Sequence, residues 1–307
     1  MIEKIVLVTR QTRLEGLVER FNSKGQAKFY IEHAGGDFGD YEAEHDVYRR
    51  SLDALRRSLD LGLKLQVMDR RFAATYLFGA ADVVVTAGPD GLVANTAKYV
   101  GGAPIVAVNP DPERIDGILL PFSVGQARGE VGLTVEGKAR LRRVSMAEAA
   151  LADGQRLLAF NDLFIGAKTH VSARYRIGFG KASEPQSSSG VIVSTGAGST
   201  GWLSSVFNMT AGVAASFGGK AARPVRLDWE DRRLAFVVRE PFLSRHSQAG
   251  VVAGLLPEGE ELTLESLMPS GGTIFSDGVE QDYLAFDSGA MARVRVAAQK
   301  ACLVVPG

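Results

Sequence analysis

The sequence contains one cysteine, no excess of charge of either sign, and no hydrophobic run approaching the ~20 residues that cross a bilayer. With Cys302 alone, no intrachain disulfide can form. Cys302 lies in the apolar run ACLVV, so we expect a small buried strand residue rather than a nucleophile. Lys plus Arg and Asp plus Glu each number 35, and the resulting net charge of zero argues against a dedicated surface for nucleic acid or an anionic membrane.

Several motifs of known enzyme and targeting classes are also missing. The histidines are scattered without the spacing of metal ligands: His33, His45, His170 and His246. The sequence has no Walker phosphate loop and no nucleophile elbow. Because Met1 to Lys4 lead directly into the apolar stretch IVLVT, we expect no signal peptide and a soluble, cytoplasmic protein.

The first part of the 307-residue chain alternates short apolar strands with helices. The expected strands are Ile5–Thr9, Leu63–Met68, Asp82–Thr86 and 103–110. Helical spacing begins at Thr12, and a long helix with one apolar face carries Tyr48, Leu52, Leu55 and Leu59. This alternation predicts an α/β domain with a doubly wound, mostly parallel sheet.

After about Phe122 short strands follow one another. They are expected at Gly132–Glu136, Arg156–Ile165, Val171–Phe179, Gly190–Ser194 and Thr273–Ser276, among others. Ser145 and Glu148 have the spacing of a capping box, which predicts a short helix, and Asp277-Gly278 predicts a plain hairpin turn. The second part is therefore β-rich and β-sandwich-like, with a domain boundary near residue 125.

A glycine-bearing turn follows the strand Asp82–Thr86, within the run VVVTAGPDGLVANTAKY. Ligands in open α/β sheets bind at such strand ends, where Gly88 and Gly91 can offer backbone N–H groups to a phosphate and Asp90 supplies a carboxylate. The alternative is a tight connection in which Asp90 caps the next helix.

Two further stretches carry polar groups beside apolar strands. Asn161-Asp162 lies within LLAFNDLFIG, where both side chains could reach a polyhydroxylated ligand or could instead bond to neighbouring loops. The segment VSTGAGSTGWLSS, Val193 to Ser205, suits a backbone-and-hydroxyl pocket for a nucleobase or phosphate; in the alternative, Ser199 or Thr200 only caps a helix.

Taken together, these stretches resemble the ATP-NAD kinase family, whose landmarks are a GGDGT turn, an Asn-Glu pair and a TGSTAY-like segment. The corresponding stretches here are Gly88 to Leu92, Asn161-Asp162 and Ala197 to Trp202. The resemblance is closest to the mitochondrial-type NAD kinase branch, through blocks in the same order along nearly the whole chain. These blocks are VNPDPERIDG from Val108, NDLFIG from Asn161, SSGVIVSTGAGS from Ser188, REP from Arg239 and GGTIFSDG from Gly271.

The resemblance implies an α/β domain over residues 1–125, rejoined by about 291–307, and a β-rich NAD-binding-type domain over 126–290, with the site in the cleft between them. Family members transfer the γ-phosphoryl group of ATP to the adenosine-ribose 2′-hydroxyl of NAD with Mg²⁺ and form homo-oligomers, so a dimer is expected. Asp90 would be the general base, and Gly88 and Gly91 would contact substrate. Asn161 and Asp162 would hold ribose hydroxyls, and the adenine pocket would be lined by Thr200, Gly201, Trp202 and Ser205.

Four positions depart from the family pattern. Pro89 replaces a glycine and has no N–H to offer a phosphate, and Leu92 replaces a threonine and so removes a hydroxyl. Asp162 replaces a glutamate, and Trp202 a tyrosine. Two alternatives therefore stay open: a kinase of another small hydroxylated acceptor, such as a sugar or nucleoside derivative, and a catalytically weak nucleotide-binding or regulatory protein.

Overall fold

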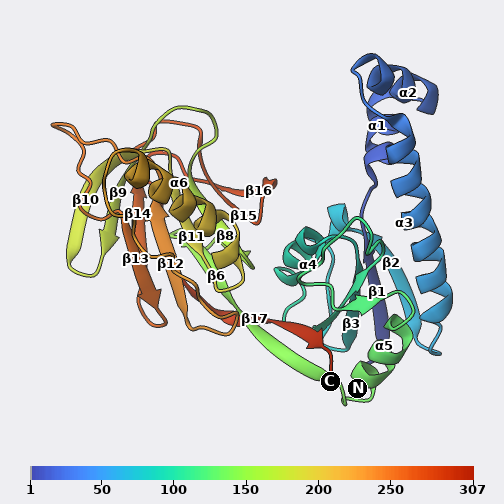
Figure 1. The fold of residues 1–307 in the computed structure, drawn as a ribbon. Helices are drawn as coiled ribbons and strands as arrows, with labels where there is room; N and C mark the ends of the chain where they lie inside the picture. Colours follow the sequence, from blue (N-terminus) through green and yellow to red (C-terminus); the bar gives the residue numbers. More distant parts are fainter. Residues whose placement is uncertain (1) are drawn as a thin grey trace. The chain divides into compact units, whose positions relative to one another are not determined.

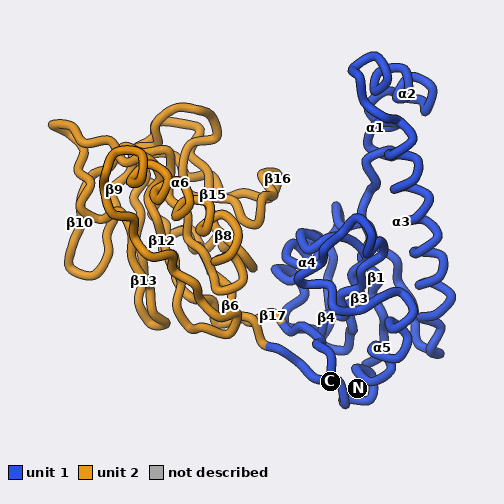
Figure 2. The backbone as a smooth tube through the Cα atoms, in the orientation of Figure 1, with its two compact units in different colours: residues 1–142, 302–307 blue, residues 143–301 orange. Residues whose placement is uncertain are grey.

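The computed structural model describes residues 2–307 as two compact units (Figures 1 and 2). Unit 1 holds the chain up to Arg142 and takes back the C-terminal residues 302–307, while unit 2 holds residues 143–301. Two long strands, β6 (Arg140–Leu151) and β17 (Met291–Val305), carry the chain from one unit into the other.

Unit 1 is built on a parallel sheet in the order β4-β3-β1-β2, and the end of β17 and the short β5 also pair in parallel with β4. The strands are β1 (Lys4–Thr9), β2 (Lys64–Asp69), β3 (Asp82–Ala87), β4 (Pro104–Asn109) and β5 (Phe122–Ser123). Strand β3 is buried over its whole length, as its apolar sequence predicts for the centre of a parallel sheet.

The helices of unit 1 are α1 (Arg13–Phe21), α2 (Lys24–His33), α3 (Phe38–Ser58), α4 (Asp90–Ala97) and α5 (Ala127–Val135), with a 3₁₀ turn, η1, at Arg70–Phe72. The predicted apolar face of the long helix is confirmed, because Tyr48, Leu52 and Leu55 of α3 pack in the core against β1 and β3. The expected strand Gly132–Glu136 is wrong. Those residues fall largely in α5, where Ala127, Val131 and Thr134 are buried at helical spacing.

Unit 2 consists of two facing antiparallel sheets with an apolar core between them. One contains β10-β9-β14-β17, with β6 beside β17 and β7 beside β6; the other has the order β13-β12-β11-β8-β15-β16. Besides β6 and β17, the strands of the first sheet are β7 (Arg156–Ala159), β9 (Ala173–Phe179), β10 (Ala182–Ser188) and β14 (Leu262–Ser266). The six strands of the second sheet are β8 (Asp162–Ala167), β11 (Val191–Ser194), β12 (Arg233–Val238), β13 (Ala253–Pro257), β15 (Gly272–Ser276) and β16 (Val279–Ala285).

The predicted fold class, an α/β domain with a parallel sheet and a β-rich sandwich-like domain, is therefore confirmed. The helix expected from the capping box at Ser145 is wrong, because Ser145 to Glu148 lie within β6. Buried Glu148 bonds to Arg156 and Arg295 instead of reaching back to a helix N-terminus. No helix within residues 2–307 is long and apolar enough to span a bilayer.

The Asp277-Gly278 hairpin is confirmed: Ser276 pairs with Val279 across the turn. Both turn residues have positive φ, 52° for Asp277 and 71° for Gly278, as a two-residue hairpin of the common primed type requires. The remaining elements of unit 2 are the 3₁₀ turn η2 (Gly198–Thr200) and the helix α6 (Trp202–Ser216), which begins at the predicted tryptophan.

Candidate functional site

The segment Gly88 to Gly91 connects the carboxyl end of β3 to α4, and Asp90 and Gly91 are the first two residues of that helix. The alternative in which Asp90 caps the helix is wrong, because Pro89 occupies the N-cap position and makes no side-chain capping bond. The Asp90 carboxylate instead accepts a hydrogen bond from the Leu119 N–H at 2.6 Å and stays partly exposed. Asp90 is thus a carboxylate held in place at the sheet edge where open α/β sheets bind ligands.

Packing explains the residues beside Asp90. A Cβ placed on Gly88 would lie 2.7 Å from Cδ2 of Leu92, so the buried leucine fills the space next to that glycine. The N–H of Leu92 is bonded to the Pro89 carbonyl at 2.8 Å. Gly91 is exposed with open space around its α-carbon. Among the turn residues, Gly91 is therefore the one whose backbone is open to a ligand.

Arg10, which was not among the predicted site residues, follows β1 and lies beside this turn, with its Cδ 3.6 Å from a Cβ built on Gly88. Its guanidinium lies 4.9 Å from the centre of the Tyr48 ring and bonds to Glu44 at 2.9 Å. The hydroxyl of Tyr48 accepts the Arg10 N–H and donates to the carbonyl of Ala87. A cation is therefore fixed at the carboxyl ends of β1 and β3, and the signal for it was a basic residue directly after the strand IVLVT.

In unit 2, Asn161 lies in the break between β7 and β8 and Asp162 is the first residue of β8, so the pair is not in the interior of one strand as expected. Within residues 2–307 the Asn161 side chain makes no hydrogen bond, and Oδ1 of Asp162 is buried without a partner. Burial, with a smaller contribution from the nearby Asp277 carboxylate, raises the pKa of Asp162 to about 7, and the Ser194 hydroxyl opposes this shift. These side chains do not bond to neighbouring loops; the loop contacts in this segment are made by its main chain.

The segment before α6 packs against that same main chain. Gly198 approaches so closely that a Cβ there would lie 2.3 Å from the Asn161 carbonyl oxygen. Neither Ser199 nor Thr200 caps α6, because the N-cap is Gly201, which has no side chain to make a capping bond. Ser199 is buried and donates to the carbonyl of Gly196, whereas Thr200 and Gly201 are exposed. Ser205 bonds back to the Gly201 carbonyl within the first turn.

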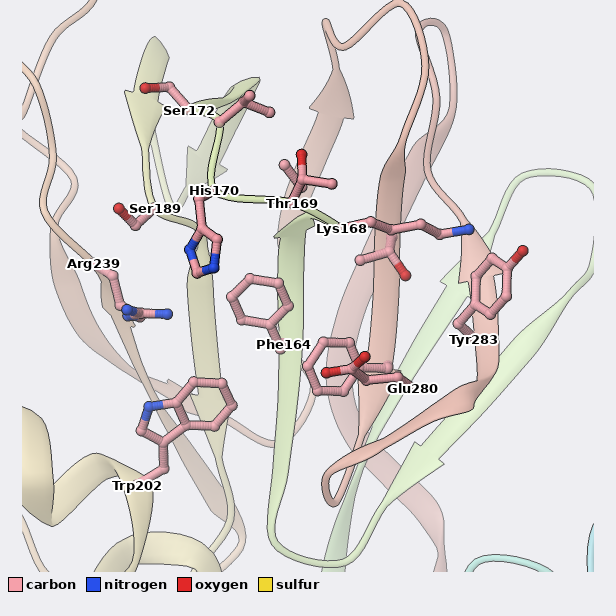
Figure 3. A pocket seen from close by; sticks show the side chains of 14 residues that line it. Phe164, Lys168, Thr169, His170, Ser172, Ser189, Trp202, Arg239, Glu280 and Tyr283 are labelled. Carbon is pink, nitrogen blue, oxygen red and sulfur yellow. The ribbon is translucent and has the colours of Figure 1, made fainter. Parts of the chain in front are cut away.

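An aromatic pocket lies on the same face of β8 as Asp162, because every second residue of a strand points to the same side. Phe164 shares the face of β8 with Asp162, opposite Leu163 in the core, and stacks on Trp202 with ring centres 5.7 Å apart. Figure 3 shows this pocket, a cavity of about 530 Å³. The aromatic, charged and histidine side chains that line it are Phe164, Lys168, His170, Trp202, Arg239, Phe275, Glu280 and Tyr283.

Cations and aromatic faces are paired in this pocket. The Arg239 guanidinium lies 5.7 Å from the Trp202 ring centre, and Nζ of Lys168 lies 3.6 Å from that of Tyr283. Such a lining suits a planar ring that carries negative charge. Of the residues predicted to bind substrate, only Trp202 lines this cavity.

The structure thus brings the predicted residues together in two groups. Gly88, Asp90 and Gly91 share one turn of unit 1. In unit 2, Asn161 and Asp162 adjoin the segment that contains the other predicted residues: Thr200, Gly201, Trp202 and Ser205. The cleft implied by the family resemblance stays a prediction. No group of three His, Cys, Asp or Glu side chains suited to a metal ion occurs in the described part of the chain.

The known proteins to which the chain is similar are NAD and NADH kinases. No protein-family model matches the chain. Among curated proteins, the mitochondrial NAD kinase 2 of Rattus norvegicus is 28% identical over 250 residues, covering 65% of this chain and 59% of the rat protein. The same enzyme of Homo sapiens is 26% identical over 250 residues, covering 65% and 57%. The chain therefore matches less than two thirds of the length of these relatives.

Two solved structures share the fold over almost the whole chain. The crystal structure of yeast NADH kinase complexed with NADH matches with a TM-score of 0.57 and 16% identity, covering 100% of this chain and 84% of that one. An NAD kinase from Archaeoglobus fulgidus in complex with ATP matches with a TM-score of 0.55 and 16% identity, covering 98% and 93%. At this identity the two structures establish the architecture.

Proposed function

Since the chain belongs to the NAD kinase family, we propose that it is a phosphotransferase that converts NAD and ATP to NADP and ADP. The oxygen of the adenosine-ribose 2′-hydroxyl attacks the γ-phosphorus of ATP, and the bond from that phosphorus to the β–γ bridging oxygen breaks. The hydroxyl proton passes to the carboxylate of Asp90. Phosphoryl transfer depends mainly on positioning and on charge stabilisation, so a site made of turns, carboxylates and hydroxyls suits this reaction.

Asp90 suits the role of general base because it is ionisable, partly exposed and held by one hydrogen bond from Leu119. A carboxylate at a strand end can accept the proton only if a hydroxyl comes within about 3 Å of it. The bond from Leu119 uses Oδ1, which leaves Oδ2 for a substrate hydroxyl.

The observation that carries the proposal is Oδ1 of Asp162, which is buried without a hydrogen-bond partner beside the side chain of Asn161. Buried polar atoms are rarely left without partners, and a bound ribose would supply hydroxyl groups to both side chains. A protonated or an ionised Asp162 can bond to a hydroxyl, so a pKa near neutrality is compatible with this role. We assign the neighbouring Thr200, Gly201, Trp202 and Ser205 to the adenine.

Mg²⁺ in phosphotransferases is commonly held by substrate phosphates and one or two carboxylates, with water completing its coordination. The absence of a three-residue cluster in residues 2–307 fits an ion that arrives with ATP. When bound, the ion neutralises charge on the phosphates. The backbone of Gly91 and the guanidinium of Arg10 are the groups of this chain that we assign to the phosphate-bearing side.

One observation favours a second candidate, a nucleotide-binding protein with little kinase activity. Pro89 has no N–H, and the Leu92 N–H is already bonded to the Pro89 carbonyl. Leu92 also fills the space beside Gly88. The turn therefore offers few hydrogen-bond donors to the phosphates of ATP, whereas Asn161 and Asp162 still offer polar side chains to a ribose.

Incubation with NAD or NADH, ATP and Mg²⁺, followed by measurement of NADP(H), tests the proposal. Phosphorylation that is lost in Asp90→Asn and retained in Asp53→Asn, an exposed position on α3, supports the kinase. If NAD raises the melting temperature but no NADP(H) forms, the binding protein is supported. If neither occurs, both functions are rejected and a kinase of another hydroxylated acceptor is favoured.

A further inference from the structure

The short segment Phe160 to Asp162, which carries the two polar side chains, receives an unusual set of main-chain contacts. The carboxylate of Asp277, in the turn between β15 and β16, accepts three backbone N–H groups. The distances are 2.9 Å from Phe160 to Oδ2, 2.6 Å from Asn161 to Oδ1 and 3.2 Å from Asp162 to Oδ1. One side chain more than 100 residues away in the sequence therefore holds every N–H of this segment.

The carbonyl groups of the same segment are also bonded. Thr195 donates its hydroxyl to the Phe160 carbonyl at 2.6 Å and its N–H to the Asn161 carbonyl at 2.9 Å. The Asp277 N–H donates a hydrogen bond to the Asp162 carbonyl at 3.0 Å. The main chain is thus fixed on both sides, whereas the Asn161 side chain and Oδ1 of Asp162 have no partner within residues 2–307.

We propose that Asp277 is a positioning residue, whose carboxylate fixes the backbone of Phe160 to Asp162 so that Asn161 and Asp162 present their side chains to the ribose of the dinucleotide. This inference rests on the proposed function, because it concerns the same ligand. The positive φ of Asp277 and Gly278 makes the turn tight enough to direct the side chain back over the start of β8.

The chemistry of a carboxylate is essential to this arrangement. A carboxylate has only acceptors and can serve three donors, whereas a carboxamide would turn one NH₂ group toward a backbone N–H. Asp277→Asn therefore keeps the volume of the side chain and breaks the contact. Asp287→Asn is the matched control, because Asp287 accepts a single backbone bond, from Gly272 at 2.9 Å, beyond the opposite end of the same hairpin.

The test measures two quantities in the wild type and both variants. The first is hydrogen–deuterium exchange of a peptide containing residues 160–162, which reports the contact without any ligand. The second is steady-state kinetics with NAD and ATP varied separately, supported by calorimetric titration of NAD. In Asp277→Asn we expect exchange to become at least tenfold faster and the KM for NAD to rise at least tenfold while the KM for ATP stays within twofold. Asp287→Asn should change neither quantity by more than twofold.

Equal NAD affinity in the wild type and Asp277→Asn would overturn the inference, as would unchanged exchange at residues 160–162. A parallel rise in the KM for ATP would also overturn it, because that pattern indicates general loosening. If Asp277→Asn does not fold, Asp277→Glu replaces it under the same criteria. A wild-type protein that binds neither NAD nor NADH rejects the proposed function itself, which is a distinguishable result.

Discussion

Replacing Gly198 with alanine tests how tightly the segment before α6 is packed against Asn161. The added Cβ would lie 2.3 Å from the Asn161 carbonyl oxygen and 2.7 Å from Oγ of Ser194, well inside van der Waals contact. Overpacking of this kind costs about 1–3 kcal/mol, and losing the bond from the Thr195 N–H to the displaced carbonyl adds about 1 kcal/mol. We therefore expect Gly198→Ala to destabilise unit 2 by about 2–4 kcal/mol.

For a domain of this size the loss corresponds to a fall in melting temperature of about 4–16 °C, measured by scanning calorimetry. The affinity for NAD should also fall, because the backbone of Asn161 must move. Gly212→Ala is the control. It lies inside α6 with open space around it, so better helix propensity should stabilise the protein by up to ~1 kcal/mol. An unchanged melting temperature and NAD affinity for Gly198→Ala would refute this packing.

Three further predictions concern charged residues and the turn at Asp90. The raised pKa of Asp162, about 7 against about 3.9 when unfolded, means that the native state binds more protons between these values. Stability should therefore fall as pH rises from about 4 to 7, and Asp162→Asn should flatten that slope in urea titrations. Glu148→Gln, which removes a buried partner of two arginines, should cost about 2–3 kcal/mol in urea unfolding, against under about 1 kcal/mol for the surface ion pair of Glu258. Pro89→Gly with Leu92→Thr should lower the KM for ATP in NADP formation and also lower the melting temperature, because buried Leu92 is lost; an unchanged KM would contradict the role given to this turn.

The sequence predicted the elements whose signals are local. The buried strand β3, the turn at Asp90, the helix starting at Trp202 and the Asp277-Gly278 hairpin each follow from residues within one short window. Hydrophobic periodicity, glycine and proline report such local geometry directly.

Tertiary partners explain the rest. The spacing of Ser145 and Glu148 is compatible with a helix start and with a strand. The strand is favoured because buried Glu148 forms ion pairs with Arg156 and Arg295 there. The role of Asp277 has no local signal at all, because the groups it holds lie more than 100 residues earlier in the chain. Arg10 gains its place beside Gly88 only when β1 and β3 pair.

Formation of NADP(H) by the purified chain, from NAD or NADH with ATP and Mg²⁺, tests the proposed phosphotransfer most directly. We expect a product that carries the new phosphate on the adenosine-ribose 2′-oxygen. The rate should fall about 10²- to 10⁴-fold in Asp90→Asn and stay within twofold in Asp53→Asn. Absence of NADP(H) from the wild type, or an equal rate in Asp90→Asn, would contradict the proposal.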